Sequence, residues 1–113
     1  MMARISYVEL PVTGTGPVRD FYAQAFGWGF TDFGPDYAAT TGGDVDLGLN
    51  GSADQPIEQV LVLVEVQDLE DALAKVEAAG GEIVVPVFGY PGGRRFHFRD
   101  PAGNVLGVFV SEG

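Results

Sequence analysis

Hydrophobic and polar residues alternate in the last part of the chain. Phe96 and Phe98 alternate with Arg95, His97 and Arg99, and this period of two is typical of a strand with one buried face. Segment 100–103 has turn chemistry, with Asp first, Pro second and Gly last. Because an apolar run follows, the pattern predicts a hairpin of two strands over 95–99 and 105–110.

Two segments carry hydrophobic residues at the spacing of a helix. Pro17 suits the first helical turn, where its missing N–H costs nothing, and predicts a helix over 17–26. Asp68 is expected to cap a second helix over 69–79, which Gly80 ends. The residues expected to form the buried stripe of the first helix are Val18, Phe21, Tyr22, Ala25 and Phe26.

The whole pattern divides into two similar halves. The first half predicts strands near 5–12, 28–33, 37–41 and 45–50, with the helix after the first strand. The second half predicts strands near 57–66, 82–88, 95–99 and 105–110, again with the helix after the first strand. We therefore predict an α+β fold in one domain over 1–113, built from two βαβββ units at about 1–51 and 56–113.

Alternation in the first strand of each half assigns its two faces. Side chains two residues apart share a face of a strand, so one set should be covered by the helix. That set comprises Val8, Leu10 and Val12 in the first half and Val60, Val62, Val64 and Val66 in the second. The set expected on the opposite face comprises Tyr7, Glu9, Leu61, Leu63 and Glu65.

Composition and charge narrow the classes of function. The chain is 46% hydrophobic and has no cysteine, so it predicts a globular domain without disulfides or thiolate chemistry. Its net charge of −10 disfavours nucleic acid and anionic membranes as partners and favours cationic ligands, and the alternative is that the charge only keeps the protein soluble. No apolar run is long enough for a signal peptide or a membrane span, so we expect a cytoplasmic location.

Three segments together resemble a known family. The hairpin segment 92–109, the run 8–12 near the start and the aromatic segment 21–28 are similar to those of the vicinal oxygen chelate superfamily. That group includes glyoxalase I, bleomycin-resistance proteins, fosfomycin-resistance enzymes and extradiol dioxygenases. The resemblance implies mixed sheets curled into a cup that holds the substrate, helices on the outer face, and a homodimer.

The resemblance also implies where a metal would be held. Metal enzymes of this superfamily typically use His on the first strand, a carboxylate on the fourth, His on the fifth and Glu on the eighth. In this chain the four positions fall at Tyr7, Asp46, Leu61 and Gly107, and another register of the fourth strand would use Gly48. Three of the four lack a suitable ligand atom. We therefore expect no bound metal and no cofactor, which disfavours metal-dependent glyoxalase, dioxygenase and fosfomycin transferase activities.

Other polar and aromatic residues are candidates for contact with a ligand. His97, the single histidine, is a candidate base or hydrogen-bond donor, and its alternative is an ordinary strand histidine. Glu9 is a candidate base or cation anchor, and its alternative is a solvated strand end. Arg95 is a candidate for binding a ligand carboxylate, but the many acidic residues of the chain favour a structural ion pair instead. The full set of candidate ligand-binding residues is Tyr7, Glu9, Trp28, Asp46, Leu61, Tyr90, Arg95, His97 and Gly107.

Three hypotheses about function follow. The first is a metal-free binding protein of the bleomycin-resistance type, whose partner is a small cationic or aromatic molecule. The second is a metal-independent lyase or isomerase that uses His97, Glu9 or Tyr7 as acid and base. The third is a glyoxalase-like protein whose ligand is an ordinary metabolite.

Overall fold

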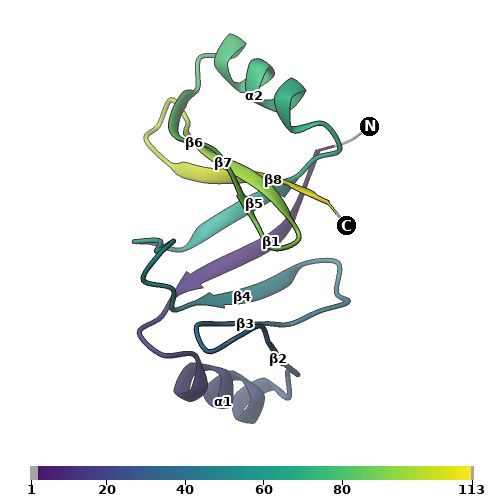
Figure 1. Cartoon of the computed structure of the whole chain (residues 1–113), viewed down its shortest axis with the longest axis vertical. Helices are drawn as coiled ribbons and strands as arrows, with labels where there is room; N and C mark the ends of the chain where they lie inside the picture. Colours follow the sequence, from purple (N-terminus) through teal and green to yellow (C-terminus); the bar gives the residue numbers. More distant parts are fainter. Residues whose placement is uncertain (1–2, 113) are drawn as a thin grey trace. The chain divides into compact units, whose positions relative to one another are not determined.

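The computed structural model describes residues 3–112, which form eight strands and two helices (Figure 1). The predicted α+β class is confirmed. The chain divides into two compact units: one comprises Tyr7–Leu61, and the other comprises the chain from Val62 onward together with the start of β1 (Arg4–Pro11). No helix among the described residues is long and apolar enough to cross a membrane.

The unit Tyr7–Leu61 is a mixed sheet with one helix. β1 pairs in parallel with β4 (Asp46–Asn50), β4 pairs antiparallel with β3 (Tyr37–Ala39), and β3 pairs antiparallel with β2 (Thr31–Asp32). The helix α1 (Thr15–Phe26) packs on β3 and β4, as Figure 1 shows. Ala38 and Leu49, which are opposite each other on β3 and β4, are fully buried.

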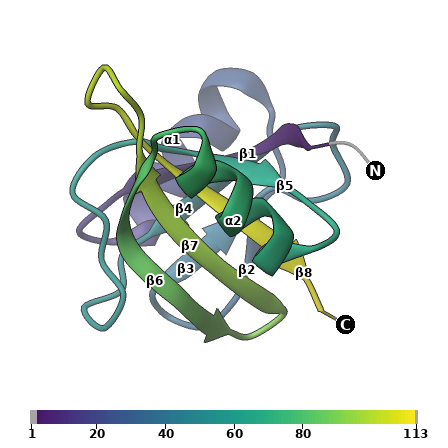
Figure 2. The same cartoon turned by 90° about the horizontal axis from the view of Figure 1, so that it is seen from above.

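The second unit has the same order of strands. β5 (Leu61–Glu65) pairs in parallel with β8 (Val105–Ser111), and β7 (Gly93–Arg99) lies between β8 and β6 (Glu82–Tyr90) in antiparallel pairing. The helix α2 (Leu69–Ala78) lies across the face of β6, β7 and β8 (Figure 2). In both units, therefore, the first strand pairs in parallel with the fourth.

The core of the second unit confirms the predicted face for Val64 and Val66 but not for Val60, which is 56% exposed and lies before β5. Phe96 is fully buried among Val66, Leu69, Val108 and Val110, and Phe98 packs against the same cluster. Burying a side chain of this size contributes about 1.5–3 kcal/mol to folding. Because side chains alternate along a strand, the residues of β7 that alternate with these phenylalanines project from the other face of the sheet.

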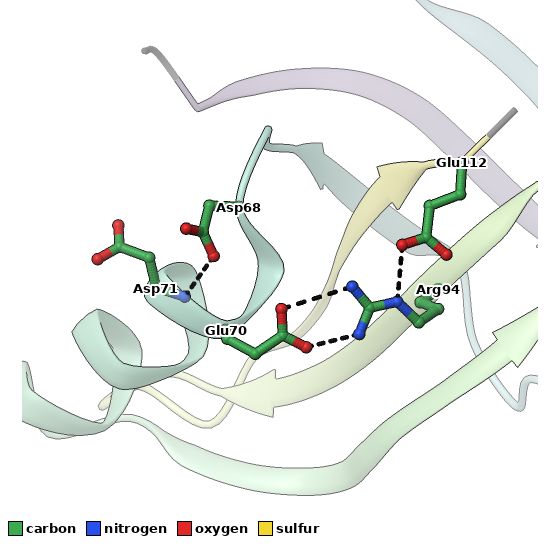
Figure 3. A network of polar contacts seen from close by, with 5 residues as sticks. All are labelled: Asp68, Glu70, Asp71, Arg94 and Glu112. Carbon is green, nitrogen blue, oxygen red and sulfur yellow. Dashed lines mark hydrogen bonds and ion pairs between the residues drawn. The ribbon is translucent and has the colours of Figure 1, made fainter.

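Polar contacts hold the start of α2. The Asp68 carboxylate accepts a hydrogen bond from the backbone N–H of Asp71 at 3.0 Å, which confirms the predicted cap. Figure 3 shows the second contact: the Arg94 guanidinium donates to Glu70 in the first turn and to Glu112 just after β8. One arginine of β7 thereby joins the helix to the end of the chain.

The predicted buried stripe of α1 is wrong. Phe21 and Phe26 are 60% and 61% exposed, and the helix begins at Thr15, earlier than expected. The rings pack on one another at the surface instead of on the sheet: the Tyr22 centroid lies 5.5 Å from that of Trp28. Helical spacing shows which side chains share a face, but it does not show which face meets the sheet. The predicted strand over 57–66 is also shorter than expected, because β5 begins at Leu61.

Substituting Gly103 tests the hairpin turn. Gly103 has φ 93°, and its N–H donates to the Asp100 carbonyl at 3.0 Å. A Cβ there would meet no atom within 4 Å, so the cost of Gly103→Val is backbone strain alone, about 1–3 kcal/mol. Chemical denaturation measures this loss. Gly29→Val is the matched control, because Gly29 has open space and no positive φ; equal losses in the two variants would contradict the turn.

The contact between Arg94 and Glu70 predicts a pH dependence of stability. The hydrogen bond from Arg94 lowers the pKa of Glu70 below its ordinary value of 4.5. Its contribution is therefore complete above about pH 4.5 and is lost as the pH falls through the lowered pKa. The free energy of unfolding of Glu70→Gln should consequently fall less steeply with acid than that of the wild type. Glu77→Gln, on the same helix outside the network of Figure 3, should keep the wild-type slope.

Candidate functional site

One face of the β1–β4–β3 sheet carries a cluster of polar side chains. The register places Tyr7 opposite Asp46, Glu9 opposite Gly48, and Tyr37 opposite Asn50. These positions share one face, because they lie an even number of residues apart on each strand. Ala38 and Leu49 occupy the other face, on which α1 packs. We call Tyr7, Glu9, Tyr37, Gly48 and Asn50 the polar cluster.

Glu9 is the buried charge of this cluster. Its residue exposure is 2%, and both carboxylate oxygens accept hydrogen bonds. Tyr37 Oη donates to Oε1 at 2.9 Å, and Asn50 Nδ2 donates to Oε2 at 3.2 Å. A carboxylate removed from water is costly unless such donors replace its hydration, and these two side chains provide that replacement.

The hydroxyl groups of Tyr7 and Tyr37 extend this arrangement into a chain. The two oxygens lie 2.6 Å apart. A phenol has a single proton, and that of Tyr37 is used toward Glu9, so the Tyr7 hydroxyl is the donor in the second bond. The hydrogen bonds therefore run in one direction, from Tyr7 to Tyr37 to Glu9.

Asn50 is itself held in place by the segment that follows β4. Its Nδ2 also donates to the Gln55 carbonyl at 3.0 Å, and its Oδ1 accepts from the Ser52 N–H at 2.9 Å. The amide thus connects the strand, the segment beyond it and the Glu9 carboxylate. Its orientation is set by contacts on three sides.

Gly48 makes room for the two phenols. A Cβ at this position would collide with the hydroxyl oxygens of both Tyr7 and Tyr37. A larger residue would have to displace the phenols that meet above it. The cluster therefore requires glycine here through close approach, not through a special backbone angle.

Burial changes the acid–base character of Tyr37. Desolvation is the main cause that raises its pKa far above the ordinary value of 10, and the charge of Glu9 acts in the same direction. The phenol consequently stays neutral and remains a hydrogen-bond donor over the whole physiological range.

Asp46 has a different set of contacts. Its Oδ1 accepts from Thr40 Oγ1 at 2.9 Å and from the Gly43 N–H at 3.2 Å. These bonds tie the turn between β3 and β4. The carboxylate proposed for the fourth-strand position is thus engaged with its own hairpin.

The second unit brings other candidate residues together. Arg95 and His97 are each 8% exposed and project from the face of β7 opposite Phe96. The guanidinium carbon of Arg95 lies 5.4 Å from the Phe88 ring centroid and 5.7 Å from that of Tyr90. His97 meets Phe88 edge-on at 5.9 Å and pairs with Gly107 of β8.

The remaining candidates lie elsewhere in their units. Trp28 belongs to the aromatic surface after α1, where its centroid is 5.0 Å from that of Phe26. Leu61 is buried at the start of β5. Sequence reasoning missed Tyr37 and Asn50 as site residues. Alternation along β3 and β4 shows which side chains share a face with Tyr37 or with Asn50. It does not show that these two residues lie beside Glu9, which depends on how both strands are aligned with β1.

The residues at the family's metal positions do not fit a transition metal. Among residues 3–112, no three His, Asp or Glu side chains gather closely enough to hold an ion. The first-strand position presents a phenol that already donates to Tyr37. A Cβ at Gly107 would press on Leu63, so the eighth-strand position has no room for a ligand side chain without movement.

Comparison with known proteins establishes the family. The chain belongs to the Glyoxalase/Bleomycin resistance protein/Dioxygenase superfamily, whose model matches residues 4–108. A curated protein of Mycobacterium bovis named "Putative glyoxylase CFP32" is 26% identical over 92% of this chain. The chain spans 44% of the length of that relative.

Solved structures share the fold. A structure titled as an NAD-dependent benzaldehyde dehydrogenase from Legionella pneumophila superposes with a TM-score of 0.79 and 16% identity, covering 94% of this chain and 98% of that one. A glyoxalase/bleomycin resistance protein/dioxygenase superfamily member from Vibrio splendidus has a TM-score of 0.63 and 16% identity, covering 98% and 100%. At these identities the likeness concerns the fold alone.

The raised pKa of Tyr37 predicts how stability changes in alkali. The unfolded chain ionises this phenol near pH 10 while the folded chain keeps it protonated. The contribution of the group is therefore complete below pH 10 and is lost as the pH rises further. Tyr37→Phe should lose stability less steeply than the wild type between about pH 9 and 11. Tyr22→Phe, outside the polar cluster, is the control; equal slopes for Tyr37→Phe and the wild type would contradict the assignment.

Proposed function

We propose that this chain binds a small cationic organic molecule, without a metal, at the polar cluster of β1, β3 and β4. The observation that carries the proposal is the buried Glu9 carboxylate, which accepts hydrogen bonds from Tyr37 and Asn50. A buried charge is weak evidence for stability, because apolar side chains of similar volume commonly stabilise a core as well or better. Its position beside two phenols suits the recognition of a ligand.

Charge supports a cation as the ligand. Glu9 carries a negative charge within the cluster, and the whole chain has a net charge of −10. A protein field of this sign raises the local concentration of cations and speeds their encounter. The rings of Tyr7 and Tyr37 add faces that attract a cation.

A metal-independent acid–base enzyme is the alternative function. The hydrogen-bonded chain from Tyr7 to Glu9 joins a phenol to a buried carboxylate, which are groups that move protons in catalysis. His97, on the face of β7 beside Phe88, is the other candidate base. Conversion of a bound molecule into a product, abolished in Glu9→Gln or His97→Ala, would favour this alternative over binding alone.

A fragment screen tests the proposed function. Small cationic, neutral and anionic aromatic fragments are added to ¹⁵N-labelled protein, and shifts of the backbone amides are followed. Cationic fragments should move the amides of Tyr7, Glu9, Tyr37 and Asn50 more than neutral or anionic ones of the same shape. A library in which no fragment moves these amides would overturn the proposal.

Glu9→Gln provides the matched variant for that screen. It keeps the shape of the side chain but removes the charge, and a charge-assisted contact is worth about 1.5–3 kcal/mol, roughly tenfold to a hundredfold in Kd. Glu58→Gln removes the same charge in the segment before β5 and should leave Kd unchanged. Equal losses in both variants would point to the overall field of the protein instead of the cluster.

The homodimer expected from the family stays a prediction. Light scattering of the purified chain should give a mass near twice 12.0 kDa at micromolar concentration. A mass of one chain would contradict it.

A further inference from the structure

Asn50 is followed directly by Gly51 at the end of β4. In such a pair the backbone nitrogen of the second residue can attack the side-chain amide carbon of the first and close a five-membered ring. Glycine leaves that nitrogen unhindered, because it has no Cβ. An asparagine before glycine is therefore especially labile in an unfolded chain. The other asparagine, Asn104, precedes the β-branched Val105 and lacks this feature.

The folded unit restrains the attacking nitrogen. The Gly51 N–H donates to the Asp36 carbonyl at 2.8 Å, so the proton that must leave before the attack is engaged in a hydrogen bond. The backbone of Asn50 is fixed as well, because it pairs with Pro11 of β1 on one side and with Tyr37 of β3 on the other. Ring closure requires this strand end to come away from both neighbours.

The folded unit also restrains the amide that would be attacked. Asn50 is 6% exposed. Its Nδ2 donates to Glu9 Oε2 at 3.2 Å and to the Gln55 carbonyl at 3.0 Å, and its Oδ1 accepts from the Ser52 N–H at 2.9 Å. A labile sequence is thus held with both reacting groups in hydrogen bonds to other parts of the unit.

We propose that Asn50 is a deamidation site that the folded unit Tyr7–Leu61 keeps unreactive and that becomes reactive when this unit opens. The Gly51 nitrogen gives up its proton to solvent and forms a bond to Cγ of Asn50. The Cγ–Nδ2 bond then breaks, and ammonia leaves with a proton returned from solvent. Water opens the cyclic imide at either carbonyl, which gives aspartate or isoaspartate. One water is consumed, one ammonia is released, and no electrons are transferred.

The product disrupts the polar cluster. Deamidation replaces the Nδ2 donor of Asn50 by a carboxylate oxygen, so Glu9 Oε2 loses this hydrogen bond and meets a second negative charge. Isoaspartate in addition lengthens the backbone by one carbon where β4 pairs with β1 and β3. A single opening followed by deamidation therefore damages the unit permanently, a chemical route to irreversible unfolding.

Deamidation rates of the full chain test the site. The wild type is kept at slightly alkaline pH with and without guanidinium chloride, and peptide mass spectrometry follows both asparagines. In denaturant, Asn50 should convert at least about tenfold faster than Asn104, because Val105 is branched at Cβ. Without denaturant, conversion of Asn50 should be at least about tenfold slower than in denaturant, because the reaction has to wait for opening of the unit.

Gly51→Ala tests the attacking nitrogen. A Cβ at Gly51 would lie 3.4 Å from the Asp36 carbonyl oxygen and 3.6 Å from Val12, which is ordinary contact, so the variant should fold. In denaturant its conversion of Asn50 should be at least about fivefold slower than that of the wild type, because the added Cβ hinders the nitrogen. An unchanged rate would mean that ring closure through Gly51 is not the route.

Asn50→Asp reproduces one product and tests its consequence. This variant should unfold at a lower denaturant concentration than the wild type. Gln24→Glu, which adds the same charge at an exposed position of α1, is the control and should keep the wild-type midpoint. Equal midpoints for Asn50→Asp and the wild type would overturn the predicted damage to the polar cluster.

Two results for the wild type would overturn the site itself. If Asn50 converts no faster than Asn104 in denaturant, the position is not labile. If Asn50 converts equally fast with and without denaturant, the fold does not protect it.

Discussion

A buried carboxylate organises the unit Tyr7–Leu61. Glu9 is almost completely removed from solvent, so each of its oxygens needs a donor from the protein. Tyr37 and Asn50 supply donors from two other strands. The Tyr7 hydroxyl meets that of Tyr37 directly over Gly48, where a side chain would collide with both. The observed register of β1, β3 and β4 is the one that brings Tyr37 and Asn50 to the Glu9 carboxylate. A shift of one residue would turn the donors to the other face of the sheet.

The same cluster explains how a member of this superfamily differs from its metal enzymes. Where they carry a first-strand imidazole, this chain has a phenol that belongs to a hydrogen-bonded chain. The fourth-strand carboxylate of Asp46 is occupied with its own hairpin, and Gly107 has no side chain. Two of the four positions thus hold side chains that are hydrogen-bonded within the protein.

The exposed aromatic residues of α1 are the main place where the hydrophobic pattern of the sequence predicted burial wrongly. The helix α1 has the spacing of an amphipathic helix, but Phe21 and Phe26 lie at the surface with Trp28. In α2 the same rule succeeds, because Leu69 and its neighbours pack on Phe96. On the face of β3 and β4 that α1 covers, the buried side chains are Ala38 and Leu49.

The sequence by itself determined the features that depend on near neighbours. Alternation in β7, the turn at Gly103 and the cap at Asp68 are local, so pattern and turn chemistry predicted them correctly. Tertiary structure alone decided the polar cluster. Its contacts join residues 28, 30 and 41 positions apart, and they depend on strand register, which no single segment encodes. Tyr7 and Glu9 could be chosen from alternation, whereas Tyr37 and Asn50 became partners of Glu9 only through pairing with β1.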